Sequence, residues 1–344
     1  MNLNMFNGKT ILITGGTGSF GKKMLSVLIK KFKCKKIIIF SRDELKQYEL
    51  KELYPVKKNK NLRYFIGDIR DYERLSLAFK NVDIVIHAAA LKQVDTAEYN
   101  PVEVIKTNIN GTENVVKAAA AAGVGKVIAL STDKAVNPLN LYGATKLAAE
   151  KLVISANNYF GFKKSTIFSV VRYGNVIGSR GSVVQLFKRL AQSKEKYVPI
   201  THEEMTRFWM TLDESVEFVL NSLKLMTGGE IFIPKIPSIK ILDLAKAMAP
   251  NKKIKIIGLR PGEKVTEVLC SEDESHLIIE FKKYFVSAPS TSLDKNSKTF
   301  LSKSFNSFLK SRSGEKGKKA LKRFSYNSSN NKKFLTIKEI KNKI

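Results

Sequence analysis

Five side chains that can exchange protons stand close together in one part of the chain. They are a hydroxyl, an acid, an amine, a phenol and a second amine, namely Thr132, Asp133, Lys134, Tyr142 and Lys146. The Tyr-x-x-x-Lys spacing places the phenol and the second amine on one helix face, one turn apart. There the lysine charge can lower the pKa of the phenol. Such a phenol could take the proton of a sugar hydroxyl while hydride leaves the carbon that bears it.

The elements around these residues indicate how they could meet. An apolar run over residues 126–130 predicts a strand that ends close to Thr132, and residues 141–158 show the pattern of a helix. In open α/β sheets, ligands bind where strands end and the following helices begin. Lys134 is the unusual member, because it stands where a carboxylate base could also have served.

The alternation of strands and helices extends over the first half of the chain. Strands are predicted at residues 10–13, 36–40, 63–66, 83–87, 126–130 and 166–171, and helices at residues 19–31, 43–53, 101–122 and 141–158. This order predicts an α/β fold with a Rossmann-type, doubly wound parallel sheet. We expect a cofactor domain over residues 1–172, to which later segments can return, a smaller α/β substrate lobe over 173–289, and a basic, weakly patterned, extended tail over 290–344.

Composition limits the location and the partners of the chain. Its 344 residues, 43% hydrophobic and 9% aromatic, fit a globular protein. No apolar run is long enough for a transmembrane helix, and the first residues lack the pattern of a signal peptide. Cys34 and Cys270 form no spacing motif, so we expect no disulfide and a cytoplasmic location. With three histidines and no cysteine pair, we expect no metal site.

The formal net charge of +29 is concentrated towards the end of the sequence, where residues 281–344 carry 17 Lys and Arg but 3 Asp and Glu. Such a tail could bind nucleic acid or an anionic membrane. Alternatively, the excess reflects a general lysine bias with a few charges that suit a phosphate-bearing substrate. We favour the second interpretation and expect no nucleic-acid or membrane partner, because the basic residues are scattered among Ser and Asn without a binding motif.

A glycine-rich turn follows the first predicted strand. Gly15, Gly18 and Gly21 would allow a tight turn, close approach of the backbone to a pyrophosphate, and close helix–strand packing. The next helix would direct its free N–H groups at the phosphates. In this strand–turn–helix context the spacing predicts a dinucleotide site formed by Gly15, Thr17, Gly18, Ser19, Phe20 and Gly21.

The end of the second predicted strand indicates which dinucleotide binds. A free ribose 2′-hydroxyl usually meets an acid here, whereas Arg accommodates a 2′-phosphate. Ser41, Arg42 and Lys46 therefore favour NADP over NAD, although Arg42 and Lys46 could simply be solvated. The contacts expected from this segment are Ser41, Arg42, Asp43, Glu44, Leu45 and Lys46.

Residues after the later strands complete the expected cofactor site. Asp68 could accept a hydrogen bond from the adenine amino group or could cap a turn or helix. The small residues after His87 leave room for a flat cofactor, and we interpret His87 itself as a packed strand-end residue. The remaining expected contacts are Ile69, Ala88, Lys92, Leu130, Ser131, Tyr142 and Lys146.

These motifs together resemble a known family. Thr14-Gly-x-x-Gly-x-x-Gly21, Asp68, Thr132 and Tyr142-x-x-x-Lys146 are similar to the extended short-chain dehydrogenase/reductases that act on nucleotide sugars. Further segments narrow the resemblance to the inverting UDP-N-acetylglucosamine 4,6-dehydratases of pseudaminic acid synthesis: His87-Ala-Ala-Ala-Leu-Lys92, Ala97-Glu-Tyr-Asn-Pro101, Ser131-Thr-Asp-Lys-Ala135, Arg172-Tyr-Gly-Asn175, Gly178-Ser-Arg-Gly-Ser182, Met205-Thr-Arg-Phe-Trp209 and Arg260-Pro-Gly-Glu-Lys264. The resemblance covers residues 9–289 and resumes weakly over 324–331. Gln93 departs from it, because the family often has histidine there.

The resemblance implies a hydro-lyase that uses NADP to dehydrate UDP-N-acetylglucosamine. Tyr142 would take the C4 hydroxyl proton as hydride passes to NADP, Lys134 would remove the C5 proton, and Asp133 would protonate the departing C6 hydroxyl. Hydride would then return to C6, and C5 would be reprotonated from the opposite face. A lysine base must be partly neutral, so we expect burial and Lys146 or Lys92 to lower the pKa of Lys134.

The resemblance also implies substrate contacts and an assembly. Thr132 would hydrogen-bond the sugar 4-hydroxyl, and Arg260 would hold the pyrophosphate through its planar fork. Glu263 could equally pair with Lys264. The residues implied near the sugar or its UDP are Lys92, Asn175, Arg180, Val183, Thr201, Arg260, Glu263 and Tyr326. The family implies a homo-oligomer, with a hexamer as one form.

Other functions stay open on the sequence alone. A retaining 4,6-dehydratase or a UDP-N-acetylhexosamine 4-epimerase would use a similar set of side chains. A non-catalytic NADP-binding protein is a further alternative, against which the intact set of Thr132, Tyr142 and Lys146 argues.

Overall fold

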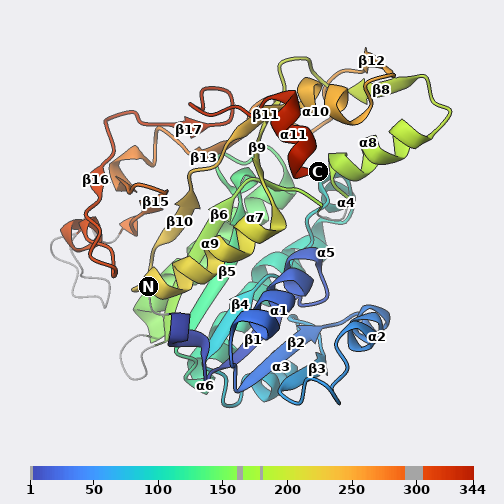
Figure 1. Ribbon diagram of the computed structural model, residues 1–344. Coiled ribbons are helices and arrows are strands. Elements are labelled where there is room, and N and C mark those ends of the chain that lie inside the picture. The colour runs from blue at the N-terminus through green and yellow to red at the C-terminus, as the bar shows by residue number, and fades with distance from the viewer. Residues whose placement is uncertain (1–2, 161–165, 179–180, 291–304) are drawn as a thin grey trace.

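The computed structural model describes residues 3–160, 166–178, 181–290 and 305–344, and one large sheet runs through it with helices on both faces (Figure 1). Within the described residues this sheet has ten strands. In spatial order they are β16 (Lys318–Lys319), β14 (Ile278–Glu280), β15 (Tyr284–Ser287), β10 (Ile231–Pro234), β6 (Ile167–Tyr173), β5 (Lys126–Thr132), β4 (Ile84–His87), β1 (Thr10–Thr14), β2 (Lys36–Ser41) and β3 (Leu62–Ile66).

The strands from β10 to β3 are parallel, whereas β15, β14 and β16 are added antiparallel at one edge. Strands β1 and β4 are buried along their whole length, which explains why they read as unbroken apolar runs. The order β3-β2-β1-β4-β5-β6 is that of doubly wound, dinucleotide-binding sheets, so the predicted Rossmann-type fold is confirmed. The order reverses between β1 and β4, and ligands of such sheets bind at this point.

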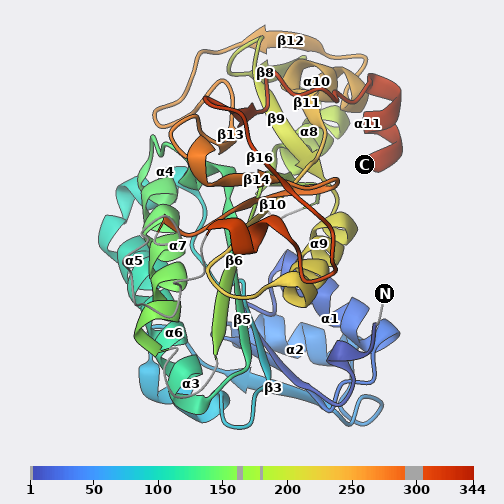
Figure 2. The same ribbon diagram turned by 90° about the vertical axis from the view of Figure 1, so that its left-hand side faces the viewer.

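Helices cover both faces of the sheet. Figure 2 shows α3, α6 and α7 on one side and α1 and α9 on the other. The helices are α1 (Ser19–Lys31), α2 (Glu44–Leu53), α3 (Tyr72–Ala78), α4 (Val94–Tyr99), α5 (Pro101–Ile105), α6 (Gly111–Ala122), α7 (Leu141–Phe160), α8 (Val183–Gln192), α9 (Leu212–Leu225), α10 (Ile241–Met248) and α11 (Ile337–Lys343). Short helical turns are η1 (Leu3–Phe6), η3 (Asp133–Ala135), η4 (Ser275–Leu277) and η6 (Phe305–Leu309).

The single helix expected over residues 101–122 is interrupted. A π-helical turn, η2 (Lys106–Asn110), separates α5 from α6. Such turns are rare and occur mostly where a helix must place a functional side chain. Here the turn holds Asn108, which is buried.

A smaller α/β lobe sits at the carboxyl ends of the parallel strands. Its strands are β7 (Asn175–Val176), β8 (Tyr197–Ile200), β9 (Thr206–Met210), β11 (Ser238–Lys240) and β12 (Lys253–Ile256), which form a three-stranded and a two-stranded sheet among the described residues. A separate apolar core forms around Trp209, Phe187 and Leu244. Strands β10, β14 and β15, which also come from residues 173–289, instead extend the main sheet.

The described part of the tail, residues 305–344, packs on both cores. Phe305 and Phe308 join the core of the main sheet, whereas Leu335 and Ile340 join that of the smaller lobe. Between them, β17 (Tyr326–Asn327) pairs with β13 (Val268–Cys270). These residues are therefore packed on the rest of the protein, which the sequence did not indicate because their few apolar side chains are too widely spaced to show a period. The tail residues 291–304 lie outside the described residues.

A buried guanidinium joins the sheet to the helix that carries Tyr142 and to the C-terminal part of the chain. Arg172 on β6 donates hydrogen bonds to both carboxylate oxygens of Glu150 on α7, at 3.0 and 2.7 Å. It also donates to the carboxylate of Glu274 and to the carbonyl of Leu269 on β13. Arg172 and Glu150 are almost completely buried, so the pairing replaces their hydration.

Replacing Arg172 with leucine should therefore destabilise the protein strongly. The change leaves the carboxylate of Glu150 buried without its partner, which should lower the free energy of unfolding by about 3–5 kcal/mol. Denaturant unfolding measures the effect. Lys9→Met removes the exposed ion pair with Asp83 and serves as the control, with an expected change of less than about 1 kcal/mol. A similar small change for both variants would contradict the prediction.

Candidate active site

A cleft of about 770 Å³ lies between the carboxyl ends of the parallel strands and the smaller lobe. It brings together the five residues predicted to do the chemistry: Thr132, Asp133, Lys134, Tyr142 and Lys146. The expected cofactor residues that line it are Gly15, Gly18, Ser19, Phe20, Gly21, Ala88, Lys92, Leu130 and Ser131. The expected substrate residues that line it are Lys92, Asn175, Val183, Thr201, Arg260 and Glu263.

The glycine turn between β1 and α1 has no room for side chains. Gly15 has a positive φ of 65°, and a Cβ atom there would lie 2.8 Å from the backbone of Ala89. A Cβ atom on Gly21 would lie 2.5 Å from the backbone of Gly16. The first residues of α1 line the cleft. The first N–H groups of a helix have no acceptors within the helix itself, so they can bind a ligand there. This arrangement fits the pyrophosphate of a dinucleotide.

The residues expected around the ribose and adenine lie after β2 and β3, outside the lining of the cleft. Asp43 caps α2 by accepting a hydrogen bond from the Lys46 N–H, and it also pairs with the Lys46 amine. Asp68 pairs with Arg70 at 2.8 Å and with Arg42 at 3.6 Å. The Arg42 side chain is 53% exposed, which leaves it accessible to a ligand.

Five other expected cofactor residues differ in their exposure to solvent. Thr17, Ser41 and Ile69 are buried, whereas Leu45 on the first turn of α2 is 68% exposed. The Ser41 hydroxyl accepts a hydrogen bond from the Gln47 amide. Glu44 is also exposed on that first turn.

A buried histidine fixes the loop after β4. His87 Nδ1 lies 2.7 Å from the Thr14 hydroxyl, and His87 Nε2 lies 3.0 Å from the Thr112 hydroxyl. The Thr112 hydroxyl donates its proton to the Asn108 carbonyl, so it must accept from Nε2–H. Burial lowers the pKa of His87 to about 3, which keeps the ring neutral. His87 is thus a packed strand-end residue, as interpreted from the sequence.

Asn108, on the π-helical turn, fastens the loop that carries Lys92. Its amide donates to the Leu91 carbonyl at 2.8 Å and to the Thr145 hydroxyl at 3.1 Å, and its carbonyl accepts from the Leu91 N–H at 2.9 Å. The loop is thereby tied to α7 next to Tyr142. The sequence analysis overlooked this residue, although an asparagine among β-branched and polar residues within a long helix is a weak signal.

Helix α7 and the turn η3 are in close contact, which brings Tyr142 and Lys134 into one site. A Cβ atom on Gly143 would lie only 2.2 Å from the Lys134 carbonyl oxygen, so this position admits glycine alone. The Thr132 hydroxyl donates to Asp133 Oδ1 at 2.9 Å. Asp133 is fully buried, and its second oxygen has no hydrogen-bond partner among the described residues.

The phenol and amine of the Tyr-x-x-x-Lys motif do not interact as expected. Burial raises the pKa of Tyr142 to about 12, opposed chiefly by the ammonium of Lys134 and by a hydrogen bond with Thr132. The amine of Lys146 instead donates to the Leu130 carbonyl at 2.7 Å. Burial lowers the pKa of Lys146 to about 8, against the attraction of Glu150.

The expected low pKa of Lys134 is corrected by the structure. Burial opposes its charge, but the carboxylates of Asp133 and Glu267 outweigh this effect and raise the pKa of Lys134 above its ordinary value. The amine lies 3.1 Å from each of these carboxylates. Lys134 is therefore an ammonium ion in the protein itself. The sequence analysis overlooked Glu267, because nothing local to it indicates a place beside Lys134.

The lobe residues form the other wall of the cleft. The side chain of Asn175 has a buried amide oxygen that accepts no hydrogen bond from the described residues. Arg260 is exposed and pairs with Glu263 at 3.0 Å, so Glu263 does not pair with Lys264. The Lys264 amine instead donates to the carbonyls of Val136 and Asn137, which docks this loop beside η3.

Of the remaining two predicted substrate residues, Tyr326 does not line the cleft. Arg180 lies outside the described residues. Tyr326 is buried, and its hydroxyl donates to the Ile236 carbonyl at 2.8 Å and accepts from the Ile236 N–H at 3.0 Å. The structure thus corrects the expectation that Tyr326 faces the sugar, because both hydrogen-bonding functions of the hydroxyl fasten the tail to the lobe.

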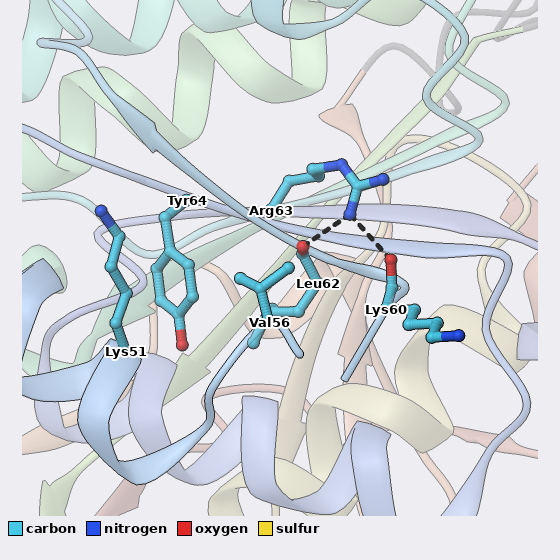
Figure 3. Close-up of a pocket in the computed structure, with 6 residues that line it drawn as sticks. All are labelled: Lys51, Val56, Lys60, Leu62, Arg63 and Tyr64. Carbon is cyan, nitrogen blue, oxygen red and sulfur yellow. Dashed lines mark hydrogen bonds between the residues drawn. The ribbon is translucent and has the colours of Figure 1, made fainter. Parts of the chain in front are cut away.

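A separate hollow lies at the edge strand β3, where Lys51, Val56, Lys60, Leu62, Arg63 and Tyr64 surround it (Figure 3). Arg63 donates to the carbonyls of Lys60 and Leu62, and Tyr64 donates to those of Leu50 and Tyr54. The side chains of Arg63 and Tyr64 are therefore hydrogen-bonded to nearby backbone carbonyls. The acid and base groups of the candidate active site lie in the cleft described above, not in this hollow. Among the described residues, no three His, Cys, Asp or Glu side chains cluster to hold a metal, and no helix could span a membrane.

The fold and the site define the class of protein. A sheet of Rossmann order, a glycine turn after β1, and Thr132, Tyr142 and Lys146 at the end of β5 and the start of α7 are the features of an extended short-chain dehydrogenase/reductase. The chain belongs to the polysaccharide biosynthesis protein family, whose model matches residues 11–289.

Known proteins support this assignment and the predicted resemblance. A Campylobacter jejuni protein named UDP-N-acetylglucosamine 4,6-dehydratase (inverting) is 56% identical over 98% of this chain and 97% of its own length. A Rickettsia bellii protein named UDP-glucose 4-epimerase is 47% identical over 78% of this chain and 80% of its own. The X-ray structure of Pen from Bacillus thuringiensis superposes with a TM-score of 0.84 at 39% identity, covering 98% of this chain and 97% of that one.

The low pKa of Lys146 makes a prediction about stability and pH. Its pKa of about 8 in the folded protein is below the ordinary 10.5, so the unfolded chain binds more protons between these values. Stability due to this group therefore rises with pH across that window. Lys146→Met removes this dependence, so its free energy of unfolding relative to the parent should be higher at about pH 7 than at about pH 10.

Denaturant unfolding at both pH values tests the prediction. Lys117→Met, which removes an exposed amine on α6, is the control and should show no such difference. The prediction fails if the relative stability of Lys146→Met is the same at both pH values.

Proposed function

We propose that the protein is an NADP-dependent hydro-lyase that converts UDP-N-acetylglucosamine into UDP-2-acetamido-2,6-dideoxy-β-L-arabino-hex-4-ulose, with inversion at C5. The observation that carries the proposal is the contact between the Asp133 carboxylate and the Lys134 amine, in one cleft with Thr132 and Tyr142. Oxidation at C4 needs only a phenol, whereas loss of water across C5 and C6 also needs a base and an acid. The relative named as an inverting dehydratase supports the same reaction.

The residues present fit a dinucleotide cofactor. The glycine turn and the start of α1 would hold the pyrophosphate. The buried Ser131 hydroxyl near the end of β5 has no hydrogen-bond partner in the part of the chain that the structure describes, so a ligand could bind it. Ser41 and the exposed Arg42 favour the 2′-phosphate of NADP. When bound, the nicotinamide would supply the hydride chemistry, taking hydride from C4 and returning it to C6.

The first proposed step is oxidation of the sugar at C4, with the Tyr142 phenol as the base. The Thr132 hydroxyl would hold the sugar 4-hydroxyl, and the Tyr142 oxygen would take its proton. A phenol with a pKa of about 12 is almost entirely protonated near neutral pH, so the charge of Lys134 must favour its phenolate. The resulting 4-keto group makes the C5 proton acidic.

A single proton shift within the Asp133–Lys134 pair would create both groups that elimination needs. Transfer from the Lys134 ammonium to the Asp133 carboxylate, over the existing 3.1 Å contact, yields a neutral amine and a carboxylic acid. The amine then removes the C5 proton, and the acid protonates the C6 hydroxyl, which leaves as water. Lys134 ends as an ammonium and Asp133 as a carboxylate, so the pair returns to its starting state. After hydride reaches C6, a proton from solvent would add to the opposite face of C5 and complete the inversion, and Tyr142 would release to solvent the proton that it took from the C4 hydroxyl.

The outer part of the cleft would bind the UDP group and the N-acetyl sugar. Arg260 offers a planar guanidinium to the pyrophosphate, oriented by Glu263, and Lys92 adds a second cation. The Asn175 amide oxygen, which has no donor among the residues that the structure describes, could accept a hydrogen bond from the sugar. Val183 and Thr201 line the same region.

We place this reaction at the first step of pseudaminic acid synthesis, in the cytoplasm and in a homo-oligomer, with a hexamer as one form. The packing of residues 305–344 on both cores supports a structural function for the tail.

Proton NMR of the product in deuterated water tests the reaction. UDP-N-acetylglucosamine should yield a 6-deoxy-4-keto sugar with the L-arabino configuration and deuterium at C5. Lys134→Ala should retain cofactor binding and reduce C5 exchange by about a hundredfold or more, because the base is lost. Lys117→Ala is the control and should exchange like the parent. Exchange at the parent rate in Lys134→Ala would mean that another group is the base.

The same spectra separate the second candidate, a UDP-N-acetylhexosamine 4-epimerase, which the identity with a protein named UDP-glucose 4-epimerase favours. An epimerase would leave the C6 hydroxyl in place and change only C4. A retaining dehydratase would give the same loss of water with the D configuration at C5. No turnover with tight NADP binding would favour a non-catalytic protein.

Cofactor preference gives a further test. Arg42→Ala should raise the Kd for NADP by about tenfold or more, because a charge-assisted contact to the 2′-phosphate is lost. Binding of NAD, which lacks this phosphate, should change little. Titration of both cofactors against the parent and the variant measures this, and equal losses for both would contradict the assignment of Arg42.

A further inference from the structure

Glu267 is a buried carboxylate beside the reacting groups. It precedes β13, and its side chain is 2% exposed. One oxygen lies 3.1 Å from the Lys134 amine and 3.8 Å from Arg207 Nε. The other oxygen has no hydrogen-bond partner among the described residues. Burying a carboxylate is expensive unless a cation compensates for it, so this group depends on its neighbours.

Lys134 is the principal partner of this carboxylate. The other cation, Arg207, is already committed to backbone carbonyls, at 2.7 Å to Thr206, 2.9 Å to Lys264 and 3.1 Å to Val265. It therefore approaches Glu267 only at 3.8 Å. The Lys134 amine instead lies at hydrogen-bonding distance from two carboxylates, those of Asp133 and Glu267.

The tail holds the backbone of Glu267 in place. The Glu267 N–H donates to the Ser328 hydroxyl at 2.9 Å, and the Ser328 N–H donates to the Glu267 carbonyl at 2.8 Å. Ser328 is fully buried, and its hydroxyl lies 2.7 Å from that of Thr206. A residue of the tail thus fixes the position from which the carboxylate reaches Lys134.

The charges that face the Lys134 amine come from several elements. The two carboxylates favour the ammonium form, and three cations and a phenol lie around them. The full set is Asp133, Glu267, Arg207, Lys92, Lys264 and Tyr142. Because the carboxylates are in direct contact and the other cations are not, removal of either carboxylate changes the balance most.

We propose that Glu267, set in place by Ser328 of the tail, is a positioning residue that holds the amine of Lys134 in the cleft and keeps it an ammonium ion until substrate is bound. The catalytic part of this proposal rests on the proposed function, in which Lys134 removes the C5 proton. The proposal deepens that function, because Glu267 then determines how readily the Lys134 ammonium passes its proton to Asp133. As a statement about the resting protein, it can be tested without turnover.

Competitive acetylation followed by mass spectrometry gives the pH at which each lysine amine becomes reactive. The proteins are the parent, Glu267→Gln and the matched control Glu274→Gln, in which a carboxylate paired with Arg172 is neutralised away from Lys134. In Glu267→Gln we expect Lys134 to become reactive about one pH unit or more lower, which is about tenfold more labelling at a fixed pH. In Glu274→Gln it should react as in the parent. An unchanged Lys134 in Glu267→Gln, or an equal change in both variants, overturns the proposal.

Two further measurements keep the test decisive if a variant is poorly folded. Lys146 reports folding in the same sample, because a buried amine is labelled more in a disrupted protein. In the parent alone, Lys134 should become reactive at higher pH than Lys92, whose pKa is lowered by desolvation and by the ammonium of Lys134. Reaction of Lys134 at the same pH as Lys92, or at lower pH, overturns the proposal.

The catalytic readout separates this inference from the proposed function. If the protein dehydrates UDP-N-acetylglucosamine, the rate of C5 deuterium exchange should increase with pH. In Glu267→Gln this increase should occur at lower pH, by the same number of pH units as the change in Lys134 acetylation. Ser328→Ala should move both in the same direction. Turnover with no shift in labelling overturns the inference and leaves the function intact. A shift in labelling without turnover of any UDP-sugar supports the positioning by Glu267 and contradicts the function.

Discussion

The guanidinium of Arg172 is the interaction on which the rest of the structure depends. It is the point where the sheet, the helix α7 and the segment after β13 meet, and all three supply part of the site. Strand β5, which is paired with β6, delivers Thr132 and Asp133, while α7 delivers Tyr142 and Lys146. Because a buried guanidinium tolerates little displacement of its carboxylates, these elements keep one relative position. The side chains of Asp133, Lys134 and Tyr142 are therefore carried by elements that are fixed relative to one another.

The balance of charges around Lys134 shows why burial alone is a poor guide to the behaviour of a lysine. Burial of an amine disfavours its charge, and the sequence analysis expected the cations Lys146 or Lys92 to lower the pKa of Lys134 further. Two carboxylates in direct contact reverse the outcome. The lysine is then stable as a cation. In the proposed reaction it acts as a base only after it has given its proton to Asp133.

The sequence predicted the parallel sheet, the glycine turn and the Tyr-x-x-x-Lys helix because each depends on local pattern and spacing. It did not predict Asn108 within a π-helical turn, since one extra residue in a helix leaves no period to detect. It also did not predict Glu267 beside Lys134 or the fastening of Tyr326, because both depend on contacts between distant segments. Long-range ion pairs leave no local signal, so the chemistry of Lys134 could not be read from the residues next to it.

The hydrogen bond between Thr206 and Ser328 joins residues 122 positions apart. Contacts of such high separation close late in folding, because a long loop must first be ordered. During synthesis, residues 1–325 can form the sheet and the glycine turn before Ser328 has left the ribosome. The backbone of Glu267 can make its hydrogen bonds to Ser328 only afterwards. The glycine turn can thus form in a nascent chain, whereas the surroundings of Lys134 are completed only after the tail has been made.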